Sequence, residues 1–170
     1  MSISAGLTTS FKEELLLGGH DFSNSGASAG TFCISIYVNS SDVLDENLTA
    51  PPFGAEEIPS TGVSGAGGYT AGGAGAAFTD NKLVVGTAPT NGGSGSTIYT
   101  SFSNKTFSGV TVTNANSAVI YNATPSGNAS GRTTPAIAVL NFNGNKSASG
   151  GDFTIQFPSP SASTAIIRIA

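Results

Sequence analysis

The stretch Thr31-Phe-Cys-Ile-Ser-Ile-Tyr-Val38 decides the class of fold. Its apolar side chains recur at every second position: Phe32, Ile34, Ile36 and Val38. Because side chains alternate between the two faces of a β-strand, this period predicts a strand with one face turned to a core. Cys33, inside this strand, is the only cysteine of the chain, so we expect a buried thiol without a disulfide partner.

Working outward from this strand, the rest of the chain reads as more short strands. They are predicted at Leu83 to Gly86, Thr97 to Phe102, Phe107 to Thr113, Ala118 to Tyr121, Ala136 to Phe142, Phe153 to Phe157 and Ala165 to Ile169. Turn sequences such as Asn143-Gly144 separate them, giving about eight strands with no helices between them. We therefore predict a mainly β chain: a single antiparallel β-sandwich or jelly-roll-like domain with one short N-terminal helix.

The helix is predicted near the start of the chain. Ser10-Phe-Lys-Glu13 has the spacing of a capping box, and Gly18-Gly19 should end the helix. Its apolar residues recur every four positions: Leu7, Phe11 and Leu15. A helix of about nine residues is marginal by itself. We therefore expect residues 1–22 to dock on the body of the protein or on a neighbouring subunit, with these three residues as interface candidates.

Residues 23–170 then form the β domain, interrupted by an irregular stretch at about 43–76. This stretch contains Pro51-Pro52, Pro59 and a run rich in glycine and alanine. Loops of this length inside a compact domain are usually functional or disordered. We expect an arm or long loop that contacts a neighbour, with its aromatic residues Phe53 and Tyr69 as further interface candidates.

Charge is the most unusual feature of the composition. Only 9% of the residues are charged, against about 25% in ordinary globular domains, so the surface is largely neutral and suits a permanent assembly. The net charge is -4 and the six cationic residues are scattered, which argues against nucleic acid as a partner. No secretory signal or membrane span is recognisable, so synthesis in a cytoplasm and no membrane partner are expected.

Residues with catalytic potential are few. His20 is the only histidine, which excludes a multi-histidine metal site, and a turn with local hydrogen bonds is the favoured interpretation of His20-Asp21. The glycine-rich run lacks the Lys-Ser/Thr of a phosphate loop. Asp42 to Asn47 matches no defined calcium loop, and a hydrated turn is favoured there, with cation binding left open. We expect no catalytic residue, cofactor or metal, and hence no enzyme.

Several segments resemble a family of small virion-associated proteins of tailed bacteriophages. The resemblance begins with Met1 to Phe22 and the strand ending Ile34-Ser-Ile-Tyr37. It continues through Gly68 to Gly73, Ala118 to Asn122, Ala138 to Phe142, Gly151 to Pro158 and Ala165 to Ala170. It implies a structural role in the virion without enzyme activity, cofactor or catalytic residue.

Within that class we favour a capsid decoration, or cement, protein. Its partners would be the major capsid protein and copies of itself, with a trimer favoured at local threefold points. The alternative is a tail, collar or head-fibre component. A binding module for a host glycan or surface protein is a further hypothesis, and it would need exposed rings near loop tips for sugar stacking, with Phe53, Tyr69 and Tyr121 as the candidates.

Overall fold

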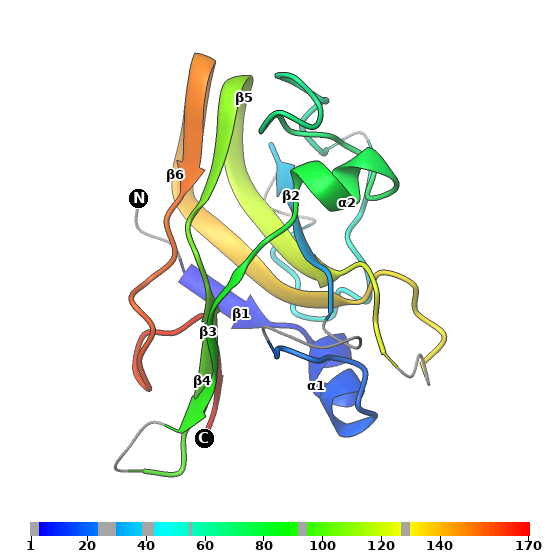
Figure 1. Ribbon diagram of the computed structural model, residues 1–170, viewed down its shortest axis with the longest axis vertical. Helices are drawn as coiled ribbons and strands as arrows, with labels where there is room; N and C mark the ends of the chain where they lie inside the picture. Colours follow the sequence, from blue (N-terminus) through cyan, green and yellow to red (C-terminus); the bar gives the residue numbers. More distant parts are fainter. Residues whose placement is uncertain (1–3, 24–29, 39–42, 55, 92–94, 127–129) are drawn as a thin grey trace.

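The computed structural model describes residues 4–23, 30–38, 43–54, 56–91, 95–126 and 130–170. The elements in chain order are β1 (Ser4–Leu7), α1 (Thr9–Leu16), β2 (Phe32–Tyr37), α2 (Ala76–Asp80), β3 (Val85–Asn91), β4 (Ile98–Phe102), β5 (Lys105–Asn122), β6 (Ala136–Ile155) and β7 (Ile167–Ile169). The strands form two antiparallel sheets, ordered β1-β6-β5-β2 and β3-β4-β7 (Figure 1). The mainly β class predicted from the sequence is confirmed, but the expectation of a single helix was wrong, because α2 lies between β2 and β3.

Two long curved strands dominate the larger sheet. β5 has 18 residues and β6 has 20, and they pair along their length from Lys105↔Ile155 to Tyr121↔Ala136 (Figure 1). The sequence predicted four short strands here, which is wrong. The turn signal Asn143-Gly144 lies inside β6, where both residues have positive φ, 52° and 110°. They take the backbone conformation of a turn, but they accommodate an irregularity in the strand pairing instead of ending the strand.

The strand that decides the fold is confirmed as β2, but it is buried on both faces. Phe32, Ile34 and Ile36 belong to a large apolar cluster that also contains residues of β4, β5, β6 and β7. On the other face, Tyr37 joins Val119 and Val139 in a second cluster. The irregular stretch at 43–76 supplies Val43 to cover this second face.

Helix α1 is confirmed near the start of the chain, but Leu7 lies in strand β1, before the helix, and the cap differs from the prediction. Thr8, not Ser10, is the N-cap, and its Oγ1 accepts a hydrogen bond from the Phe11 amide at 3.2 Å. Ser10 is buried and donates to the carbonyl of Leu48 at 2.8 Å. Thr8 Oγ1 also donates to the Ala136 carbonyl at 2.6 Å, which ties the start of α1 to β6. After the helix, Gly18 has φ 73°, consistent with the predicted stop.

The stretch at 43–76 is irregular, and it runs along the outer edge of β2. The amide of Ile58 donates to the Ile36 carbonyl at 2.9 Å, and that of Val38 donates to the Glu56 carbonyl at 3.0 Å. Residues after α2 continue the cover, with the Leu83 amide bonded to the Phe32 carbonyl at 2.8 Å. The described part of this stretch thus pairs with the chain's own sheet, satisfying backbone groups that an edge strand leaves open.

Candidate functional site: an apolar groove beside the C-terminal strand

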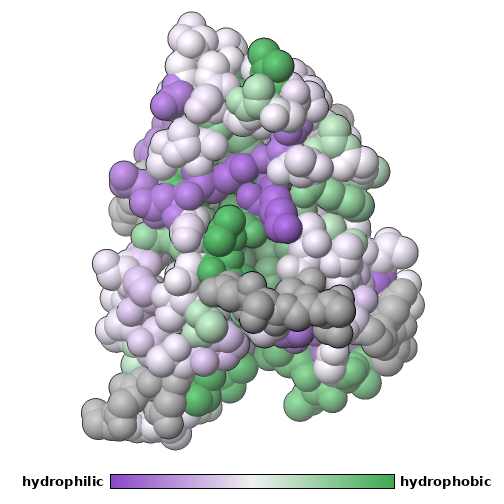
Figure 2. Space-filling view, viewed as in Figure 1, coloured by the Kyte–Doolittle hydropathy of each residue, from purple (hydrophilic) through white to green (hydrophobic). Residues whose placement is uncertain are grey.

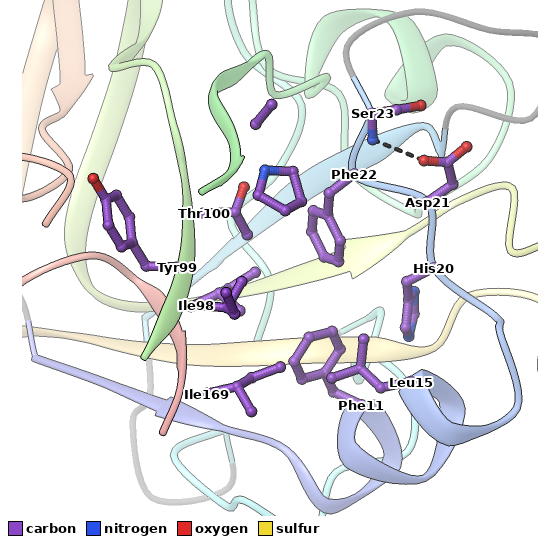
Figure 3. Close-up of a pocket in the computed structure, with 13 residues that line it drawn as sticks. Phe11, Leu15, His20, Asp21, Phe22, Ser23, Ile98, Tyr99, Thr100 and Ile169 are labelled. Atoms are coloured by element: carbon purple, nitrogen blue, oxygen red, sulfur yellow. Dashed lines mark hydrogen bonds between the residues drawn. The ribbon is translucent and has the colours of Figure 1, made fainter. Parts of the chain in front are cut away.

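A hollow of about 620 Å³ opens between α1, the segment 20–23, and the strands β4 and β7 (Figure 3). Its walls are mainly apolar and include Phe11, Leu15, Phe22, Ile98 and Ile169. A second hollow of about 610 Å³ shares Phe11, Leu15 and Ile169 with the first and adds Leu7 and Leu16. We call these two connected hollows the β7 groove. Each has the volume of a typical binding cavity.

Large apolar side chains are exposed along this groove. Leu16 is 91% exposed, and Ile169 and Ile98 are 48% and 41% exposed. Figure 2 shows hydrophobic surface at the corresponding lower end of the molecule, over α1 and the end of the smaller sheet. Single exposed aliphatic residues are ordinary, but several gathered around a hollow indicate an interaction surface.

The charged residues that line the second hollow, among those the structure describes, are both cationic. They are Lys12 of α1 and Arg168 of β7. Arg168 donates from Nη1 to the carbonyl of Ser163, which leaves its other N–H groups available. The first hollow is lined by one carboxylate, that of Asp21, which accepts the amide of Ser23 at 2.8 Å (Figure 3). The turn expected at His20-Asp21 is therefore present.

A buried polar network lies behind the groove and fixes α1 to the rest of the chain. The carboxylate of Glu14, 2% exposed, accepts hydrogen bonds from Ser130 Oγ and from Arg132 Nη1, the latter at 3.3 Å. Arg132 also pairs with Glu13 at 2.8 Å. The hairpin connection between β5 and β6 is thereby linked to the helix. This network was not predicted from the sequence, because its members lie more than a hundred residues apart.

His20 belongs to the same network. Its Nδ1 is 3.1 Å from Asn122 Nδ2, which can only donate, so the imidazole proton sits on Nε2. Nε2 lies 3.7 Å from a carboxylate oxygen of Glu14 and makes no hydrogen bond among the described residues. Burial lowers the pKa of His20 to about 4, although the Glu14 charge opposes the shift. Because Ser130 bonds the carboxylate and not the imidazole, this arrangement does not activate a nucleophile.

The interface candidates of the sequence analysis fall into two groups. Leu7, Phe11 and Leu15 all line the β7 groove, with Phe11 fully buried and the other two half-buried. Phe53 and Tyr69 lie elsewhere: Tyr69 is 2% exposed, and half-buried Phe53 packs edge-on against Tyr121 with ring centroids 5.4 Å apart. Tyr121 is itself buried. Tyr69 and Tyr121 therefore offer no open face for sugar stacking.

Two other expectations concern possible ligands. Asp45 Oδ1 accepts the backbone amide of Asn47 at 2.8 Å and its side-chain amide at 3.0 Å, as in a local turn, while Asp42 lies outside the described residues. Across the residues that the structure describes, no three His, Cys, Asp or Glu side chains gather in a way that would hold a metal ion. Cys33 is buried and free, as predicted.

Sequence reasoning missed Leu16, Ile98 and Ile169, which contribute most of the exposed apolar surface in the groove. Ile98 and Ile169 occupy paired positions of β4 and β7, so each was correctly placed on a strand. Leu16 follows Leu15 and falls off the helical stripe of Leu7, Phe11 and Leu15. An apolar residue outside the predicted buried face is the signal that would have found it.

No family model, curated protein or solved structure matches this chain. No helix in the described parts of the chain is long and apolar enough to cross a membrane.

Proposed function

We propose that this chain is a non-enzymatic structural protein of a tailed-phage virion, and that it functions as a capsid decoration, or cement, protein. The observation that carries the proposal is the β7 groove, an open apolar surface built mainly from side chains without catalytic chemistry. Its partners are the major capsid protein and further copies of the same chain, with a trimer at local threefold points favoured.

The free energy for assembly comes from covering this groove. A fully exposed leucine that becomes buried contributes about 1.5–3 kcal/mol, and Leu16 is 91% exposed. Ile98 and Ile169 add partial contributions of the same kind. The free energy that these contacts contribute is modest for one subunit. Repetition by symmetry across many subunits makes them sufficient to hold adjacent capsomers together.

The low density of charge supports the same proposal. Interfaces are depleted in Lys, Glu and Asp, because each such side chain must lose water when a partner covers it. Only 9% of the residues of this chain are charged. When a partner covers this largely neutral surface, the free-energy cost of desolvation is therefore small.

We further propose that the two sheets pack as an open, jelly-roll-like sandwich. Support comes from the apolar cluster that unites residues of β2, β5 and β6 in one sheet with Phe102 of β4 and Ile167 of β7 in the other. The sandwich would be open on the side of β1 and β7, which are the outermost strands of their sheets. The β7 groove lies on this side, so the opening of the sandwich and the assembly surface coincide.

The first test is to find the protein in purified particles of the phage that encodes it. Quantitative mass spectrometry should give a copy number comparable with that of the major capsid protein. A handful of copies would instead place the chain in the tail, collar or a head fibre. Its absence from particles would overturn the virion proposal altogether.

The second test asks whether the groove carries assembly. Particles lacking the protein are mixed with purified wild-type chain, with Leu16→Lys, or with the matched control Val63→Lys. Val63 is 69% exposed and does not line either hollow of the groove. We expect Leu16→Lys to reduce occupancy at least tenfold and Val63→Lys to bind like wild type. Equal occupancy of all three would remove the groove from the proposal.

A further inference from the structure

We propose that the β7 groove receives an extended segment of a different polypeptide, which adds as a strand to the free edge of β7. The segment carries aliphatic side chains at alternate positions and a carboxylate that pairs with Lys12 or Arg168. This inference rests on the proposed function, since it names the chemistry of the partner that covers the groove.

The free edge of β7 supplies the backbone groups. Among the residues that the structure describes, β7 pairs on one side only, with Ile98↔Ile169 and Thr100↔Ile167, in the sheet ordered β3-β4-β7. In an antiparallel strand, alternate residues direct their N–H and C=O groups to the opposite edge. These groups are the usual attachment point for an added strand, in which main-chain hydrogen bonds provide affinity and side-chain pockets provide specificity.

Space for such a strand exists beside β7. A third hollow, of about 290 Å³, is lined by Ala5 and Leu7 of β1 together with Ile166 and Arg168. It shares Leu7 and Arg168 with the second hollow of the β7 groove. The second and third hollows therefore adjoin each other at Leu7 and Arg168, beside β7. Every second side chain of an added strand points the same way, so alternate aliphatic residues would enter the apolar hollows.

The positive charges of Arg168 and Lys12 favour another polypeptide as the partner over a second copy of this chain paired through the same edge of β7. A symmetric antiparallel pair centred on this three-residue strand would set Arg168 directly opposite its own equivalent. Like charges directly opposite each other in a sheet are destabilising. Lys12 lines the same hollow as Arg168, and no described carboxylate does. A segment bearing Asp or Glu meets both cations with the opposite sign of charge.

The test uses the purified full-length protein and a displayed library of random linear peptides. We expect enriched peptides to alternate aliphatic and polar residues and to contain Asp or Glu. A synthetic enriched peptide should shift the NMR amide signals of Ile167 to Ile169. Its affinity, measured by calorimetry, should fall at least tenfold for Arg168→Glu and stay unchanged for Val63→Lys. Lys12→Glu, on the exposed face of α1, is the second charge variant in case Arg168→Glu unfolds.

Four outcomes would overturn the inference. They are a library without enrichment, enriched peptides that lack acidic residues, amide shifts confined to another surface, and binding that both charge variants leave intact. Enrichment of apolar helical peptides would indicate a helix in the groove and would also count against it. None of these measurements uses virus particles. Peptide binding with no protein in the virion would therefore refute the proposed function alone, and the reverse result would refute only the strand addition.

Discussion

Tyr69 donates its phenolic proton to Oε1 of Glu57 at 2.6 Å, deep inside the protein. The same phenolic oxygen accepts the amide of Ile36, in the middle of β2, at 3.0 Å. The second carboxylate oxygen of Glu57 accepts the amide of Gly72 at 3.0 Å. One aromatic side chain thus fastens the irregular stretch at 43–76 to the central strand, because the buried Ile36 amide finds its partner in Tyr69, whose own proton is bonded to Glu57 within the stretch.

Replacing Tyr69 with Phe should destabilise the protein by about 2–3 kcal/mol at pH 7, because the Glu57 carboxylate and the Ile36 amide both lose a buried partner. Burial raises the pKa of Glu57, and the bond from Tyr69 holds it down. Without that bond the pKa of Glu57 in the folded protein rises further. The loss of stability caused by Tyr69→Phe should therefore be smaller in acid, where Glu57 is protonated in both the folded and the unfolded state. Denaturant unfolding at pH 7 and pH 4 measures both effects.

The control for this variant is Tyr99→Phe. Tyr99 is half-buried in β4, and its hydroxyl makes no hydrogen bond among the described residues. It should change stability by less than about 0.5 kcal/mol. Losses of the same size in the two variants would show that the Tyr69 hydroxyl contributes nothing specific.

Gly73→Ala should be more destabilising than Gly75→Ala. Both glycines have similar positive φ, 62° and 57°, so the backbone disfavours an alanine at each position. At Gly73 a Cβ would lie 2.0 Å from Cζ of Phe53, whereas at Gly75 it meets no atom within 4 Å. Overpacking should add about 1–3 kcal/mol at Gly73 only, measured by thermal and denaturant unfolding.

The double variant Phe53→Ala, Gly73→Ala isolates the contact between the two residues. Removing the ring should abolish the extra cost of the alanine, so the two substitutions should be strongly non-additive. Additive losses would place the strain of Gly73→Ala elsewhere.

His20 should titrate with a midpoint near pH 4 in the folded protein, because burial lowers its pKa to about 4 from the ordinary histidine value of 6.5. Because His20 is the only histidine of the chain, its ring signals in an NMR spectrum need no further assignment. Since the folded pKa is the lower one, the stabilising contribution is complete above pH 6.5 and is lost as the pH falls toward 4. The total loss should be about 3 kcal/mol.

His20→Gln provides the comparison, since it keeps a polar side chain but removes the titration. Between pH 6.5 and 4 its stability should fall less steeply than that of the wild type, with the difference growing by about 1.4 kcal/mol per pH unit. A ring midpoint near 6.5, or parallel stability curves, would contradict the buried, neutral imidazole.

Cys33 should resist thiol reagents in the native protein. It is fully buried in β2, and burial raises the pKa of the thiol to about 12, so both access and the reactive thiolate are lacking. With Ellman's reagent the native chain should react only as fast as it unfolds, and promptly in denaturant. Ser103→Cys, at an exposed position, should provide a fast-reacting site for comparison. Rapid reaction of native wild-type Cys33 would refute its burial.

Some of the fold was predictable from local pattern alone. The alternation in Thr31 to Val38 is a property of neighbouring residues, and it correctly gave β2. Helix α1 and its glycine stop follow from signals within one turn. The fusion of four predicted strands into β5 and β6 was not predictable, because Asn143-Gly144 has the same local preference in a turn and in a bulge.

The candidate site shows the same division. Leu7, Phe11 and Leu15 were recognised from their helical spacing, which was wrong for Leu7 because that residue ends strand β1. All three nevertheless line the β7 groove. The stripe did not reveal that Leu16, one position away, remains 91% exposed. Which side chains stay uncovered depends on where β4 and β7 lie relative to α1, and no local pattern contains that information.

By itself the sequence determined the β class, the short helix, the buried cysteine and the scarcity of charge, because each depends on composition or on residues close in the chain. Tertiary structure alone decided the cover over β2, the Glu14–His20–Arg132 network and the open groove beside β7. These features join segments far apart in the chain. Their contacts stabilise the protein only after folding has brought those segments together.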